Sequence, residues 1–232
     1  MRLTLRTLAA LLSYPSAELR AHIGDIRAAL DSEAALPRQA RDGLEPILDR
    51  LQRDEVIDAQ AGYTDLFDRS RALSLHLFEH VHGENRERGQ AMLDLNQQYI
   101  EAGLLLDSQE LPDFIPIFLE YASCLPAPEA RETLGQPAHV FAALDARLRD
   151  RDSDYAAVFG AILALANAVP DRDALDELQK NVPSEDPALI DEEWEEKEVT
   201  FSGAHDMGGP TGIVARLRAK GKAMTAARGT RS

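Results

Sequence analysis

Two histidines and a glutamate near the middle of the chain have the spacing of a metal-binding helix. His76, Glu79 and His80 spell H-x-x-E-H within LHLFEHVHGENRERGQAM, residues 75–92. On a helix this spacing puts two imidazoles one turn apart with a carboxylate beside them, as in inverted zinc metalloproteases. The histidines would then bind zinc, and the glutamate would be the base that activates a zinc-bound water. One interpretation is therefore a zinc-dependent metallohydrolase.

That interpretation needs a third ligand from elsewhere in the chain. Three glutamates on later predicted helices are candidates, namely Glu120, Glu129 and Glu132. The motif itself fixes only three letters, which makes chance matches common. The alternative is that His76 and His80 are hydrogen-bonded groups at a partly buried helix end. Other catalytic signatures, such as a nucleophile elbow or a phosphate-binding loop, are absent from the sequence, so an enzyme is not the favoured class.

Composition and charge narrow the classes further. The chain has 232 residues, 44% of them hydrophobic and 28% charged, as expected for a globular protein. Its net charge of −15 argues against nucleic acid as a partner. No window approaches the roughly 20 apolar residues of a membrane span, which predicts a cytoplasmic protein that is not a membrane protein. The one cysteine, Cys124, is expected to be a small core residue.

Apolar residues recur at helical spacing along most of residues 1–182. Ser16 is placed to cap one helix, whose stripe is Leu19, Ile23, Ile26 and Leu30. Further stripes lie within residues 44–51, 56–67, 92–99, 114–125, 140–148 and 158–169. No long segment has the alternating pattern of a strand. The sequence predicts an all-α, single-domain bundle of roughly eight to ten helices over residues 1–182.

The last fifty residues differ in character from the rest. Residues 171–200 hold twelve acidic residues against three basic ones, whereas residues 201–232 hold one against six. Few residues there could build a core, so residues 183–232 are predicted to form a flexible tail, acidic first and then basic. Trp194, the only tryptophan, lies in the acidic part and is a candidate anchor for docking on the bundle or on a partner.

Longer motifs around the histidines resemble a known family. YTDLFDRSRALSLHLFEHVHGENRERGQAM, residues 63–92, is similar to the core segment of NarJ-type nitrate reductase assembly chaperones, a group of redox-enzyme maturation proteins. LLSYPS near the N-terminus, ELPDFIPIFLEYAS at residues 110–123 and VTF at 199–201 also resemble this family, in the same order. One departure is Phe114, which stands where the wider family often has a histidine.

The resemblance implies an all-helical, cytoplasmic chaperone without catalytic activity. Proteins of this family bind the N-terminal peptide of the apo catalytic (alpha) subunit of respiratory nitrate reductase. They hold it ready for insertion of the molybdenum cofactor and the iron-sulfur cluster, and they delay its docking at the membrane. No cofactor is expected to be stably bound, and contact with the molybdenum cofactor would be transient and through the client.

A client peptide that folds as a helix needs an apolar groove and acidic groups for its basic residues. We expect this groove between residues 63–83 and the helix after Pro112, with Asp65 among its acidic groups. The candidate client-binding residues are Tyr63, Phe67, Arg69, His76, Leu77, His80, Glu110, Asp113, Phe118, Glu120 and Tyr121.

Overall fold

A computed structural model describes residues 1–82, 87–106, 110–180 and 182. This part of the chain is an all-α single domain, and its only β-type pairing is an isolated bridge between His76 and Phe114. It holds thirteen α-helices, more than the eight to ten expected. The number is higher because several are short, and because one predicted helix is divided in two at His22.

The first half of the fold is a run of short helices. They are α1 (Arg2–Leu12), α2 (Ala17–Ala21), α3 (Ile23–Glu33), α4 (Arg38–Gly43), α5 (Glu45–Arg53) and α6 (Val56–Tyr63), followed by the π-helix η1 (Thr64–Asp68) and the 3-10 helix η2 (Arg71–Leu73). The second half comprises α7 (Leu77–His82), α8 (Glu87–Glu101), α9 (Ile115–Cys124), α10 (Ala127–Gly135), α11 (Ala138–Arg149), α12 (Ala156–Ala166) and α13 (Arg172–Lys180).

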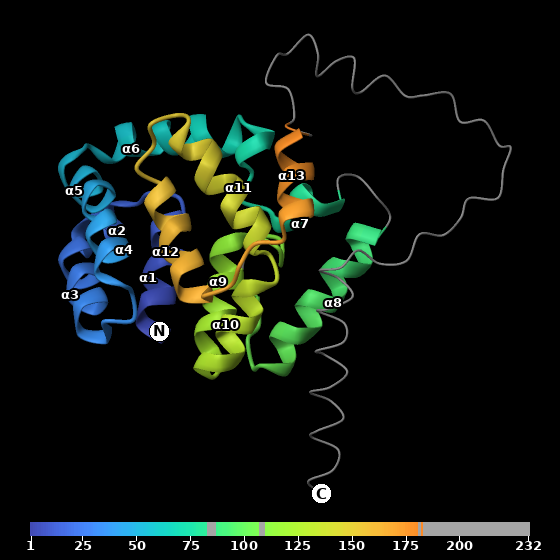
Figure 1. Ribbon diagram of the computed structural model, residues 1–232. Coiled ribbons are helices and arrows are strands. Elements are labelled where there is room, and N and C mark those ends of the chain that lie inside the picture. The colour runs from blue at the N-terminus through green and yellow to red at the C-terminus, as the bar shows by residue number, and fades with distance from the viewer. Residues whose placement is uncertain (83–86, 107–109, 181, 183–232) are drawn as a thin grey trace, which may run out of the picture.

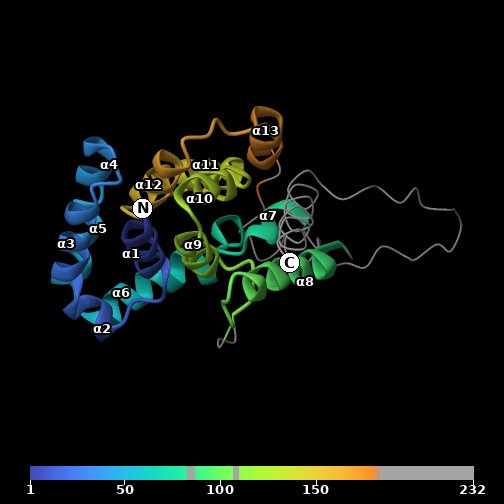
Figure 2. The same ribbon diagram turned by 90° about the horizontal axis from the view of Figure 1, so that it is seen from below.

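Helices α1 and α9 pack against each other through the middle of the molecule. The helices α2 to α5 lie on one side of this pair, and α10 to α12 lie on another, while α8 is at the far edge (Figures 1 and 2). Helix α12 packs on both α10 and α11, and its Val158, Phe159 and Ile162 are fully buried. This confirms the central position that its apolar sequence indicates.

Local sequence signals explain where several helices begin and end. The Ser16 side chain accepts a hydrogen bond from the Leu19 N–H, which confirms the predicted cap. Pro46 lies in the first turn of α5, where its missing N–H costs nothing. Beyond α8, Gly103 adopts a positive φ of 83°, a conformation that glycine reaches without strain.

Glu33 joins the end of α3 to the start of α1. Its Oε2 accepts hydrogen bonds from the backbone N–H and the hydroxyl of Thr4, both at 2.7 Å. Burial would raise the pKa of Glu33, but hydrogen bonds from the N-terminal ammonium and Thr4 outweigh it and lower the pKa to about 2. A carboxylate from a distant helix therefore satisfies the open N–H groups at the start of α1.

Two predictions about single residues were wrong. Cys124 is exposed, because it follows Glu120 by one helical turn on the solvent side of α9, while Ser123 faces inward. Val169 is 85% exposed, because α12 ends at Ala166 and Asn167 takes the left-handed conformation with φ of 49°.

The flexible tail predicted for residues 183–232, and with it Trp194, lies outside the described residues, so the proposed boundary at residue 182 stays a prediction. Within the described residues, every helix is too short or too polar to cross a membrane.

Candidate functional site

The H-x-x-E-H segment does not lie on one helix. His76 precedes α7 and forms an antiparallel bridge with Phe114, just before α9. The Leu77 N–H donates to the Asp113 carbonyl at 3.0 Å, and the Ile115 N–H donates to the Leu75 carbonyl at 2.8 Å. These two hydrogen bonds join the start of α7 to the start of α9, and we call this junction the α7–α9 clip.

Asp113 is the buried centre of this clip, with no exposed surface. Its Oδ2 accepts a hydrogen bond from the Phe78 N–H at 3.0 Å, so it caps α7 from outside that helix. Its Oδ1 lies 3.2 Å from Nδ1 of His76. This hydrogen bond raises the pKa of His76 above its ordinary value of 6.5, against the opposing effect of burial. The carboxylate thus favours the protonated imidazolium.

His80 lies in a different environment one turn later. Its Nε2 donates to the Ser74 carbonyl oxygen at 2.8 Å. Burial lowers the pKa of His80 from 6.5, and the nearby positive charge of Arg147 lowers it further. Glu79, between the histidines, is in an ion pair with Arg88 at 3.3 Å. The three residues of the motif therefore have three separate partners.

This geometry corrects the zinc-site interpretation. The metal hypothesis needs two imidazoles on one helical face, whereas His76 lies outside the helix and is hydrogen-bonded to Asp113. Across the described ranges, His, Cys, Asp and Glu side chains form no group of three or more that could hold a metal ion. Glu120 is exposed on α9, and Glu129 and Glu132 follow on α10, beyond the opposite end of α9 from His76.

The two histidines should affect stability in opposite directions as pH changes. The raised pKa of His76 stabilises the fold below pH 6.5, and that contribution is lost as pH rises through the raised value. The lowered pKa of His80 stabilises the neutral, folded form above pH 6.5, and that contribution is lost as pH falls. We expect His76→Gln to cost more unfolding free energy at pH of about 5.5 than at about 8.5. His80→Gln should cost more unfolding free energy at the higher pH. Urea titrations of both variants at the two pH values measure these costs. A cost that is the same at both pH values would contradict the pKa shift of the histidine concerned.

His76 also lines an open hollow of about 380 Å³ that we call the His76 pocket. It lies between η1, η2, the start of α7 and the residue before α9. Its lining residues are Tyr63, Phe67, Asp68, Ser70, Arg71, Ser74, Leu75, His76, Glu79 and Phe114. Three aromatic rings thus face a hollow that also carries two carboxylates and one guanidinium.

The aromatic side of the His76 pocket is held rigidly. The Tyr63 hydroxyl donates to the Leu12 carbonyl at 2.9 Å, and its ring centroid lies 4.8 Å from that of Phe67. Phe67 in turn meets the buried Tyr155 edge-on at 5.0 Å. Both Tyr63 and Phe67 are placed by the change from α6 to the π-helix η1, a departure from α-helical geometry that is frequent at functional sites.

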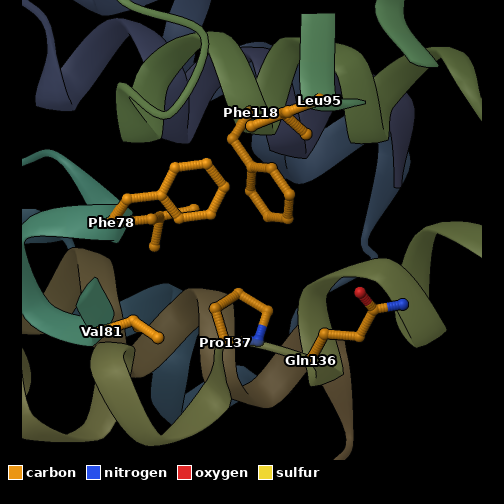
Figure 3. A pocket seen from close by; sticks show the side chains of 7 residues that line it. Phe78, Val81, Leu95, Phe118, Gln136 and Pro137 are labelled. Atoms are coloured by element: carbon orange, nitrogen blue, oxygen red, sulfur yellow. The ribbon is translucent and has the colours of Figure 1, made fainter. Parts of the chain in front are cut away.

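A second hollow is a narrow apolar slot of about 10 Å³ on the other side of α7. Figure 3 shows Phe78 and Val81 facing Phe118, Leu95 and Pro137 across it, with Gln136 at its edge. Leu77 also lines the slot. At this volume it has room for about one water molecule, too little for a peptide side chain.

The structure divides the predicted client-binding residues among several places. Tyr63, Phe67 and His76 meet at the His76 pocket, whereas Leu77 and Phe118 line the apolar slot. The others are Tyr121, buried with its ring 4.8 Å from that of Tyr99; Asp113, buried; His80, half-buried; Glu110 and Glu120, exposed; and Arg69, exposed and paired with Asp65 at 2.7 Å.

The sequence prediction did not include several residues that line the His76 pocket, chiefly Asp68, Ser70, Ser74 and Phe114. Most of them lie in the irregular stretch between α6 and α7, where the apolar periodicity stops. That interruption was the available signal, since binding residues concentrate in irregular segments held by a rigid scaffold.

The fold resembles that of a solved helical protein described as a putative redox enzyme maturation protein from Archaeoglobus fulgidus. The match has a TM-score of 0.52 at 23% identity and covers 70% of this chain and 91% of that one. The two chains thus share a helical fold.

Sequence comparison identifies the family. A family model described as "Nitrate reductase delta subunit" matches residues 26–161. The nitrate reductase molybdenum cofactor assembly chaperone NarJ of Escherichia coli (strain K12) is 45% identical over 210 residues, which is 90% of this chain and 88% of that protein. The probable chaperone NarW of the same strain is 40% identical over 168 residues, 72% of this chain and 73% of that protein. The chain belongs to this family and is a NarJ-type chaperone, not an enzyme.

Proposed function

We propose that this protein is a cytoplasmic chaperone for respiratory nitrate reductase. It binds the N-terminal region of the apo catalytic (alpha) subunit and assists insertion of the molybdenum cofactor and the iron-sulfur cluster before the complex docks at the membrane. The chaperone itself binds no cofactor stably, and it meets the molybdenum cofactor only on the client. The relatives that support this proposal are named as nitrate reductase molybdenum cofactor assembly chaperones.

The His76 pocket is the observation that carries the proposal. Its floor of Tyr63, Phe67 and Phe114 offers apolar contacts. Asp68 and Glu79, the latter paired with Arg88, place carboxylates beside that floor. A helical peptide with apolar anchors and basic residues is complementary to both features. We assign the client peptide to this pocket rather than to the apolar slot, because the slot is too small.

Phe114 should be a main contact for the client. Its ring lies 5.4 Å from that of His76, and Phe114→Glu would place a charge on the apolar floor. We expect this variant to bind a peptide from the N-terminus of a nitrate reductase catalytic subunit about tenfold more weakly than the unmodified protein, which corresponds to about 1.4 kcal/mol. Isothermal titration calorimetry with the full chain measures this.

The control for that experiment is Ile57→Glu, which places the same charge at an apolar residue that is 70% exposed on α6. It should leave the affinity unchanged. Binding to the unmodified chain should also weaken with added salt, because carboxylates lie at the pocket edge. No heat at peptide concentrations well above micromolar, or equal losses in both variants, would count against the pocket.

A further inference from the structure

A third carboxylate lies near the two that line the His76 pocket. Glu110 does not line the pocket, but it lies four residues before Phe114, which does. Burial raises the pKa of Tyr63, and the charges of Tyr155, Asp68 and Glu110 raise it further. Asp68 and Glu79 line the pocket beside Arg71, Glu79 is paired with Arg88, and Glu110 lies in the bend before Phe114; we call the three carboxylates of Asp68, Glu79 and Glu110 the acidic rim. Asp113 adds no free charge, because it is buried against His76.

The chain contains one segment with the complementary chemistry. Residues 213–222, IVARLRAKGK, hold four basic residues and no acidic ones. Ile213, Val214 and Leu217 follow the i, i+1, i+4 spacing of an apolar face on a helix. Apolar anchors among positive charges are what the aromatic floor and acidic rim would recognise.

Charge on the body of the protein favours the same contact. Residues 1–182 contain thirty-one acidic and eighteen basic residues, whereas residues 201–232 contain one acidic residue and six basic ones. A basic segment attached to an acidic body is attracted to it before any specific contact forms.

The end of the described body lies close to the pocket. Helix α13 packs on α11, and Arg147 of α11 donates both to the Leu178 carbonyl in α13 and to the Ala72 carbonyl in η2. Figure 1 shows α13 beside α7. Residues 183–212 then separate the body from the basic segment, and thirty residues span up to about 100 Å when extended. A body of this size has a radius of gyration of only about 16 Å, so the segment can reach the pocket.

We propose that residues 213–222 occupy the His76 pocket intramolecularly and must be displaced before another ligand binds there. That this other ligand is the client peptide rests on the proposed function. The contact between residues 213–222 and the pocket does not. A tethered ligand has an effective concentration on the order of a millimolar. A segment that binds with a Kd of about 100 μM would therefore fill the pocket in about ten of eleven molecules.

The test uses the full chain and a fluorescein-labelled synthetic peptide of residues 211–226, measured by fluorescence anisotropy. In the triple variant Arg216→Glu, Arg218→Glu, Lys220→Glu the tethered segment can no longer compete, and the added peptide should bind about tenfold more tightly than to the unmodified chain. The control reverses Arg228 and Arg231 to glutamate, outside the segment, and should bind the peptide as the unmodified chain does.

The place of binding is tested in the triple variant by adding Asp68→Lys or Glu110→Lys, both at exposed residues. Each should weaken peptide binding at least about threefold. Asp42→Lys on α4, which contributes no residue to the pocket lining, should not.

Equal affinity of the unmodified chain and the triple variant would overturn the proposal, as would indifference to both rim substitutions. If the labelled peptide bound anionic lipid vesicles but did not bind the triple variant, the segment would instead be a membrane-binding one. Because no client peptide is used, these results are independent of the calorimetric test above.

Discussion

Replacing Asp113 by alanine is expected to lower the free energy of unfolding by about 3–5 kcal/mol. The carboxylate is fully buried and holds both the Phe78 N–H at the start of α7 and the imidazole of His76. Its removal leaves a buried N–H without an acceptor and a histidine without its counter-ion, and both losses are costly inside a protein. Urea unfolding followed by circular dichroism measures the change.

Two further variants give this prediction its control. Glu110→Ala removes an exposed carboxylate three residues earlier and should change stability by less than about 0.5 kcal/mol. Asp113→Asn keeps an oxygen for the Phe78 N–H, and its amide can donate to a neutral His76, so it should cost less than alanine. An alanine variant as stable as the Glu110 control would contradict the role of Asp113 as a buried cap.

Arg147→Met should destabilise the protein by about 1.5–3 kcal/mol and should loosen α13 most. The guanidinium donates to the Ala72 carbonyl at 2.7 Å and to the Leu178 carbonyl at 2.6 Å, at the ends of two separate helices. Burial lowers the pKa of Arg147, as expected for a cation held by carbonyl groups. Methionine keeps much of the apolar stem but cannot donate these bonds.

The matched control is Arg149→Met on the same helix. Arg149 is 62% exposed and pairs with Asp145 one turn away, a surface contact worth about 0.5 kcal/mol or less. Hydrogen–deuterium exchange should show faster exchange of amides in residues 172–180 for Arg147→Met only. Unchanged exchange there would mean that packing on α11, rather than Arg147, holds α13 in place.

The positions of most helices could be predicted from local sequence. Stripes such as Leu44, Ile47, Leu48 and Leu51 repeat at the helical period and become buried faces, because one face of each helix must meet the core. What could not be predicted depends on contacts between distant residues. The end of α2 at His22 and the π-helix η1 have no periodic signature in the sequence.

In the candidate site, too, local sequence predicted some features, whereas others depend on contacts between distant residues. The segment around His76 was recognised as important, and Tyr63, Phe67 and His76 do meet at one pocket. Spacing alone, however, placed His76 and His80 on one helix. Nothing in the local sequence indicates that His76 lies before the helix and is hydrogen-bonded to Asp113, thirty-seven residues away. Local patterns report periodicity, whereas the identity of a buried polar partner is a property of the tertiary fold.

The packing of α1 on α9 has a consequence for synthesis of the protein on the ribosome. Leu5, Leu8, Leu11 and Leu12 of α1 are fully buried in the folded chain, yet α9 begins only at Ile115. At about 5–20 residues per second, α1 is translated roughly 5–20 s before synthesis of its main partner begins. During that interval α3 can pack on α1, but the face of α1 that packs on α9 has no native partner. This NarJ-type chaperone therefore exposes apolar surface of its own while it is being made.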